Sequence, residues 1–300
     1  MRAAACALCL WLLAASAQAL AAPVAACPPA GWDRAALDTL KREQFAVSDA
    51  ARRDALARAL TACLSDPDPV LRDGIAFEAL SAWMRQGALP TPTLRALRDD
   101  LYARLDGPEG AGYAQPFAAL VLAEVARTDR IAAWMSADER AAMVARAVRY
   151  ETSVRDYRGY EPVGGWRHGV AHGADWLMQL SLNPAVDEAQ LTAIADAVAS
   201  QAVPERAHAY TFGEPERLAA PVLYAARRGF RDEAQWTTWF AALPSRLGDS
   251  ALAYRDPAWL ARRHDLVAFL HAVYVGAATS DDARVRTLLP GATAALKALR

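Results

Sequence analysis

Residues 164–175 read GGWRHGVAHGAD, and the apolar residues that follow predict a helix from residue 164 to about residue 182. On such a helix Gly165, Gly169 and Gly173 are four residues apart and share one face. A glycine inside a helix costs about 0.5–1 kcal/mol relative to alanine. We therefore expect another backbone or a ligand to approach this face closely, because such a contact would explain the glycines.

The rest of the chain repeats the signals of helix starts. Asp68-Pro69, Thr91-Pro92 and Asp256-Pro257 each place a proline in the first turn of a predicted helix, and Ser136 with Glu139 forms a capping box. We find no alternating strand pattern, and the short connections carry Pro, Gly or Asp. The sequence therefore predicts an all-α fold. We expect antiparallel helix pairs stacked as a degenerate HEAT-like solenoid or, as the alternative, an α/α toroid.

The composition fits one folded unit. Hydrophobic residues make up 54% of the chain and charged residues 22%, which predicts a packed core rather than disorder. No polar linker divides the chain, so we expect one helical-repeat domain over residues 30–300. The net charge of −1 gives no attraction for nucleic acid, and no later apolar run is long enough for a transmembrane helix. We expect a monomer with an unidentified ligand or protein partner.

The first residues predict export. An apolar run that is too short to span a bilayer follows Arg2, and Ala17-Gln18-Ala19 fits a cleavage site. We expect residues 1–22 to be a signal peptide and the mature protein to be periplasmic or secreted. Cys27 and Cys63 remain, and an oxidising compartment favours a disulfide between them. The alternatives are a lipoprotein anchored through Cys27 and two free thiols.

The histidines of the central stretch allow three interpretations. His168 and His172 are four residues apart and Asp175 is three further on, a spacing that can bind a divalent metal. The same residues could form a ligand or catalytic site without metal. The third interpretation is a pair of buried histidines, bonded to Asp175 or to backbone carbonyls beside a tight helix contact. HExxH, P-loop, GxGxxG and GxSxG motifs are missing, so no other cofactor is indicated.

Two flanking stretches carry further candidate residues. RDYRGYEP, residues 155–162, crowds charged and aromatic side chains into a predicted loop; such residues bind carboxylates or sugars and also form ordinary ion pairs. WLARRHDLVAFLHAVY, residues 259–274, places His264 and His271 on one face of a largely buried predicted helix. We expect these two to be core residues or, if the helix packs on residues 164–182, part of the same site. His208 is given no role.

With these motifs in view, the chain resembles the bacterial family known as domain of unknown function 2785. The resemblance rests on an Arg-Gly-Tyr loop, a Gly-Trp pair and a histidine helix, which match Arg158, Gly159, Tyr160, Gly165, Trp166, His168, His172, Gly173, Ala174 and Asp175. LRDGIAFEALSAWMRQGAL, residues 71–89, also resembles the family's N-terminal helical repeats, so the likeness covers about residues 35–280. Similar sequences usually carry a lysine where this chain has Gly164. The resemblance implies a helical fold and no activity.

Two functional hypotheses follow. The first is an exported protein that binds a ligand or partner around residues 155–175, through Arg155, Arg158, Tyr160, Trp166, His264 and His271. The alternative is a hydrolase or lyase acting on an envelope saccharide or peptide, with the catalytic candidates Asp156, Glu161, His168, His172 and Asp175, the last three also being the metal candidates. An enzyme needs two titratable groups in one open pocket, whereas a purely structural motif would have its histidines sealed under packed helices.

Overall fold

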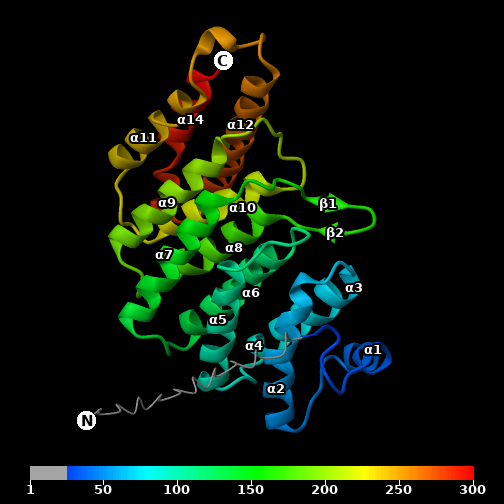
Figure 1. Ribbon diagram of the computed structural model, residues 1–300. Coiled ribbons are helices and arrows are strands. Elements are labelled where there is room, and N and C mark those ends of the chain that lie inside the picture. Colours follow the sequence, from blue (N-terminus) through cyan, green and yellow to red (C-terminus); the bar gives the residue numbers. More distant parts are fainter. Residues whose placement is uncertain (1–25) are drawn as a thin grey trace, which may run out of the picture.

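The computed structural model describes residues 26–300, so the predicted signal peptide lies outside the described residues. The chain is mostly helical, as predicted, and its helices follow one another along an elongated stack from α1 at one end to α14 near the other (Figure 1). Within residues 26–300, no helix has the length and apolar character needed to cross a membrane. The arrangement of the helices as HEAT-like repeats stays a prediction.

The N-terminal part of the stack contains α-helices, one tighter 3-10 segment and one wider π-helical segment. Asp68 caps the third helix and Pro69 lies in its first turn, as predicted. The helices are α1 (Arg34–Arg42), α2 (Ala50–Leu60), α3 (Pro69–Leu71), α4 (Glu78–Arg85) and α5 (Thr91–Leu105), with a 3-10 turn at Thr61–Ser65 and a π-helical stretch at Arg72–Phe77. A disulfide joins Cys27 to Cys63, which confirms the predicted pair.

The remaining helices form the middle and the C-terminal end of the stack. Capping boxes begin three of them, and the box of Ser136 and Glu139 is the predicted one. Their bounds are α6 (Ala114–Ile131), α7 (Ala137–Ser153), α8 (Gly169–Ser181), α9 (Glu188–Ala202), α10 (Glu214–Arg227), α11 (Glu233–Ala241), α12 (Pro257–Ala278), α13 (Ala283–Arg286) and α14 (Leu289–Ala298), with 3-10 turns at Pro244–Leu247 and Ser250–Leu252.

Helix α8, the glycine-bearing helix, lies in the middle of the stack and packs against α6, α7, α9 and α10. Gly169 and Gly173 face α7, as a close contact requires. A side chain at position 173 would overlap the carboxyl group of Glu151. The predicted close approach therefore exists, but side chains of α7 make it, rather than a backbone or a ligand.

The start of this helix was predicted wrongly. Gly165 and Trp166 form strand β2 (Gly165–Trp166), which pairs antiparallel with β1 (Tyr160–Glu161) in a small hairpin that projects from the stack (Figure 1). Gly165 has φ +68°, a value that suits a hairpin and not a helix. It therefore does not share the glycine face. His168, with φ +56°, is the last residue before α8.

Helix α12 also differs from its prediction. Its buried face contains Leu266, Phe269 and Leu270, whereas His264 and His271 are exposed. The helix packs mainly on α10 and α14. These two histidines are therefore neither core residues nor close partners of the histidines on α8. The buried face of α12 is not the face that contains the two histidines. The apolar residues of this helix are so nearly continuous that the sequence does not show which face is buried.

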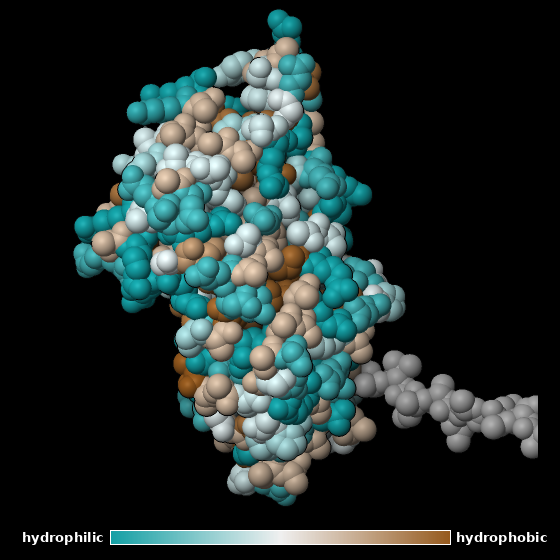
Figure 2. All heavy atoms as spheres, turned by 90° about the vertical axis from the view of Figure 1, so that its left-hand side faces the viewer, coloured by the Kyte–Doolittle hydropathy of each residue, from teal (hydrophilic) through white to brown (hydrophobic). Residues whose placement is uncertain are grey.

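Buried apolar side chains connect the two ends of the stack. One hydrophobic cluster runs from Leu37 on α1 to Leu299, just after α14. On the face of the molecule seen in Figure 2, hydrophilic residues are mixed with weakly apolar ones, and strongly hydrophobic residues are visible in a hollow near mid-height.

Candidate ligand-binding cleft

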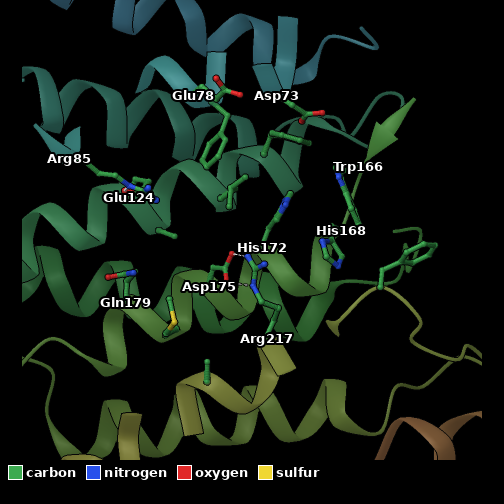
Figure 3. A pocket seen from close by; sticks show the side chains of 17 residues that line it. Asp73, Glu78, Arg85, Glu124, Trp166, His168, His172, Asp175, Gln179 and Arg217 are labelled. Carbon is green, nitrogen blue, oxygen red and sulfur yellow. Dashed lines mark hydrogen bonds and ion pairs between the residues drawn. The ribbon is translucent and has the colours of Figure 1, made fainter. Parts of the chain in front are cut away.

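A cleft of about 750 Å³ opens between the π-helical stretch and α4 on one side and α8 and α10 on the other, and α6 also contributes to its lining (Figure 3). This volume suits a small organic molecule. The lining combines aromatic, aliphatic, charged and imidazole side chains: Asp73, Phe77, Glu78, Arg85, Phe117, Leu120, Ala123, Glu124, Trp166, His168, His172, Asp175, Met178, Gln179, Phe212, Arg217 and Ala220.

The π-helical stretch forms one wall of the cleft. It contains Asp73 and Phe77, both of which line the cavity. Arg72 lies fully buried behind this wall, where its guanidinium is 3.9 Å from the ring centre of Tyr113 and donates to the Gly164 carbonyl at 2.7 Å. Arg72 thereby ties the wall to the hairpin. Burial raises the pKa of the Asp73 carboxyl, against the opposing effect of Arg72.

Opposite this wall, α8 presents one face to the cleft. His172, Asp175 and Gln179 follow a helical three- and four-residue spacing and all line the cavity. Asp175 forms a two-point ion pair with Arg217 of α10, which Figure 3 shows on the same side of the cleft. The side-chain oxygen of Gln179 accepts a hydrogen bond from Arg130 Nε at 3.1 Å. These contacts hold the polar groups of α8 in fixed positions.

His172 is held as a neutral imidazole. It is nearly fully buried, its Nδ1 lies 3.2 Å from the Pro116 carbonyl oxygen, and its ring meets Phe117 edge-on. A carbonyl only accepts hydrogen bonds, so Nδ1 carries the proton and Nε2 is left as an acceptor. Burial lowers the pKa of His172 well below its ordinary value, and the imidazole is therefore uncharged near pH 7.

His168 is also neutral and is held on two sides. Its ring stacks on Trp166, with ring centres 4.8 Å apart, and its Nε2 lies 3.5 Å from Glu214 Oε1. Burial lowers the pKa of His168 to about 4, and burial raises the pKa of Glu214. The hairpin fixes the backbone here, because the His168 amide donates to the Arg158 carbonyl at 3.0 Å.

Three aromatic side chains form a cluster at one end of the cleft. Trp166 meets Tyr160 and Phe212 edge to face, with ring centres 5.2 and 5.9 Å away. The exposed fractions are 47% for Tyr160, 38% for Trp166 and 39% for Phe212. Phe212 lies against Gly159, where any side chain would overlap its ring. Grouped, exposed aromatic rings at a cavity mark a binding surface.

The structure brings together three of the five catalytic candidates. His168, His172 and Asp175 line the cleft, whereas Asp156 and Glu161 lie outside its lining, in ion pairs with Arg158 and Arg167. The third interpretation allowed buried histidines bonded to Asp175 or to backbone carbonyls. Both histidines are buried and His172 Nδ1 lies at the Pro116 carbonyl, whereas Asp175 pairs with Arg217 instead. Across residues 26–300, no three His, Cys, Asp or Glu side chains converge in an arrangement that could hold a metal ion.

Of the six binding candidates, Trp166 lines the cleft and Tyr160 contacts Trp166 at its end. The other four lie outside the lining: Arg155, Arg158, His264 and His271. Arg155 instead borders a separate small cavity.

The part of the site that comes from α10 and from the loop before it was not predicted. Phe212 and Arg217, which line the cleft, and Glu214, which contacts His168, belong to the segment HAYTFGEPER, residues 208–217, and none of them is a candidate from the sequence. Its Gly-Glu-Pro sequence is a readable helix start, with Gly213 before the helix and Pro215 in the first turn. Nothing in the sequence indicates that this helix start faces α8.

One comparison with known proteins gives a match. The model of a family described as a protein of unknown function, DUF2785, matches residues 104–275, which is more than half of the chain. The matched range includes α6, the hairpin, α8 and α10, and it does not extend to residues 71–89. Neither the curated proteins nor the solved structures contain a significant match.

Proposed function

Because this chain belongs to the DUF2785 family, whose description assigns no function, we propose from the geometry of the cleft that the protein binds a small polar organic ligand. The observation that carries this proposal is a preformed cleft of about 750 Å³ with exposed aromatic rings at one end and fixed polar groups along its length. Sites for small molecules combine these features, since apolar surface supplies affinity and a few oriented polar groups supply specificity.

We also propose that the protein acts outside the cytoplasm, as a HEAT-like helical array. The disulfide between Cys27 and Cys63 supports the location, because disulfides persist in oxidising compartments. The apolar run within residues 1–22 supports it independently. The order of the helices along the stack, which follows the chain, supports the array (Figure 1).

One observation favours a hydrolase or lyase as the second candidate. His168 borders the cleft with the buried Glu214 carboxyl 3.5 Å from its Nε2, a pairing of imidazole and carboxyl that can orient a general base. Replacing His168 by Gln would then abolish product formation while leaving ligand binding within about threefold of wild type. If wild-type protein forms no product from a ligand that it binds, this second candidate is wrong and binding is the function.

The experiment that tests the binding proposal is a thermal-shift screen of wild-type protein against neutral, anionic, cationic and peptide small molecules. Binding to the folded state raises the unfolding temperature. The matched variants are Ala220→Trp, which fills part of the cleft, and Ala234→Trp, which adds the same side chain at an exposed position of α11. We expect hits that disappear in Ala220→Trp and persist in Ala234→Trp. No hits, or hits that Ala220→Trp leaves unchanged, would overturn the proposal.

A further inference from the structure

We propose that the ligand of the cleft is an uncharged saccharide with one sugar ring against Trp166. This inference rests on the proposed ligand-binding function and names its substrate class.

Every charged side chain in the lining already has a partner. Asp175 pairs with Arg217, Glu124 with Arg85, Asp73 with the buried Arg72, and Glu78 with Lys41. An anionic ligand bound to one of the arginines would also lie beside the carboxylate of that pair, and a cationic ligand bound to a carboxylate would lie beside its arginine or lysine. The repulsion within each pair offsets the attraction, so the paired lining favours neither sign of charge. An uncharged ligand avoids this repulsion.

The paired groups still offer hydrogen bonds to hydroxyl groups. A carboxylate has about four acceptor positions and a guanidinium five donors, so a single ion pair leaves several of each free. Figure 3 places the Arg85–Glu124 pair and the Asp175–Arg217 pair at different points along the cleft, with Gln179 near the second. His172 adds an acceptor at Nε2, since its Nδ1 faces the Pro116 carbonyl. A chain of hydroxyl-bearing rings would meet donors and acceptors along this length.

The aromatic end supplies the surface for a ring. His168 covers one side of the Trp166 indole, while 38% of the Trp166 surface stays exposed. Phe212 stands nearly perpendicular to the indole, with an interplanar angle of 86°, and so makes a corner with it. The C–H face of a sugar ring is apolar and packs on such an indole, whereas its hydroxyls point outward to polar groups.

A saccharide matches both parts of this lining: its ring face suits the aromatic end, and its hydroxyl groups suit the stretch with the ion pairs. A purely apolar ligand suits only the aromatic end. The polar half holds two ion pairs that a purely apolar ligand would desolvate without offering them hydrogen bonds, which is unfavourable. Both histidines are neutral near pH 7, because burial lowers the pKa of each. They therefore add no charge that would select an acidic sugar.

The test uses the mature protein and matched tetrasaccharides in titration calorimetry. The neutral probes are cellotetraose, maltotetraose, xylotetraose and tetra-N-acetylchitotetraose, and the charged probes are tetragalacturonate and chitosan tetramer. We expect binding of at least one neutral probe, with the same Kd in 50 mM and 500 mM NaCl, because screening acts only on charged ligands. The charged probes are expected to bind at least about tenfold more weakly.

Three variants locate the sugar ring. Trp166→Ala is expected to weaken binding of the neutral probe about five- to tenfold, and Trp166→Phe is expected to retain most of the affinity, because a ring in that position still stacks. Trp32→Ala is the control, because Trp32 lies just before α1 and outside the cleft. This variant should bind the probe as wild type does.

The outcomes separate the two proposals. If a charged or non-saccharide compound binds in a manner that Ala220→Trp abolishes and neutral saccharides do not, the cleft is a ligand site and the saccharide inference is overturned. If neutral saccharides bind with equal affinity to wild type and Trp166→Ala, the placement of the ring on Trp166 is overturned. If no compound of any class binds in the cleft, the proposed function itself fails.

Discussion

At the scale of single residues, Gly173 has a specific partner that explains it. Helix α7 places Glu151 against it, and Glu151 is fully buried with no hydrogen-bond partner for either carboxyl oxygen among residues 26–300. We expect Gly173→Ala to lower the free energy of unfolding by about 1–3 kcal/mol, the usual cost of overpacking. In a Glu151→Ala background the same change should cost clearly less, because the carboxyl overlap is gone and only the ring of Tyr150, 2.9 Å from the added Cβ, still opposes it. Urea unfolding of the four proteins checks this, and equal costs in both backgrounds would contradict it.

The Glu151 carboxyl also predicts how stability depends on pH. Burial raises the pKa of Glu151 well above its ordinary value of 4.5. Above pH 4.5 the unfolded chain therefore releases this proton while the folded protein keeps it, so this group lowers stability as the pH rises. Gln does not titrate. The free energy of unfolding of Glu151→Gln minus that of wild type should then grow by up to about 1.4 kcal/mol per pH unit above 4.5.

Urea unfolding at pH 5, 6 and 7 measures this difference for Glu151→Gln. The comparison with wild type cancels the other buried groups, including His168 and His172, that titrate in both proteins. Parallel pH profiles for the two proteins would show that the Glu151 carboxyl ionises normally in the folded state.

At the scale of the elements, helix starts could be predicted and the turns around the site could not. Asp68-Pro69, Asp256-Pro257 and the box at Ser136 act within a few residues, so the sequence alone reveals them. The hairpin depends instead on contacts that form only in the folded chain, such as the Arg167 amide donating to the Gly159 carbonyl at 2.9 Å. Gly165 is four residues from Gly169, and this spacing led to the prediction that the helix begins before residue 165. In the structure the helix begins at Gly169.

The candidate site shows the same limit. The α8 motif identified His168, His172 and Asp175 because they are close in sequence. Their partners Glu214 and Arg217 come from a helix start more than forty positions along the chain, as the separation of 42 between Arg217 and Asp175 shows. Such pairs depend on which helix packs beside α8, and one sequence carries no signal for that choice.

The disulfide between Cys27 and Cys63 should contribute measurably to the free energy of unfolding. It closes a loop with a sequence separation of 36, for which chain entropy predicts a stabilisation of about 4 kcal/mol. We expect Cys27→Ala with Cys63→Ala to lower the free energy of unfolding by about that amount without changing ligand affinity, since neither residue lines the cleft. Reductant should destabilise wild type and leave the double variant unchanged. An unchanged wild type would contradict the prediction.

At the scale of the whole molecule, we expect the affinity of the cleft for its ligand to be independent of pH near neutrality. The pKa of His168 is about 4 and that of His172 is lower than usual, both through burial. Neither histidine gains a proton until the pH falls well below 6.5. We therefore expect the Kd for a neutral saccharide to change less than about twofold between pH 8 and pH 5.5. A marked loss between pH 7 and 6 would show that a histidine in the cleft titrates normally.

The cleft lies between helices that are far apart in the sequence. One wall comes from the π-helical stretch and α4 and the other from α8 and α10, and α6 also lines the cleft (Figure 3). A ligand that contacts both walls stabilises their relative position, so its binding should slow amide hydrogen exchange in Arg72–Phe77 as well as in α8. Protection confined to one wall would place the ligand outside the cleft.

The most direct test is a crystal structure of the protein with the tightest-binding tetrasaccharide. We expect a sugar ring against Trp166, with hydroxyl groups hydrogen-bonded to Asp175 and Arg217 and with that ion pair intact. A ligand bound elsewhere on the surface, or one whose charged group has displaced Arg217 from Asp175, would contradict the claim that this cleft binds uncharged saccharides.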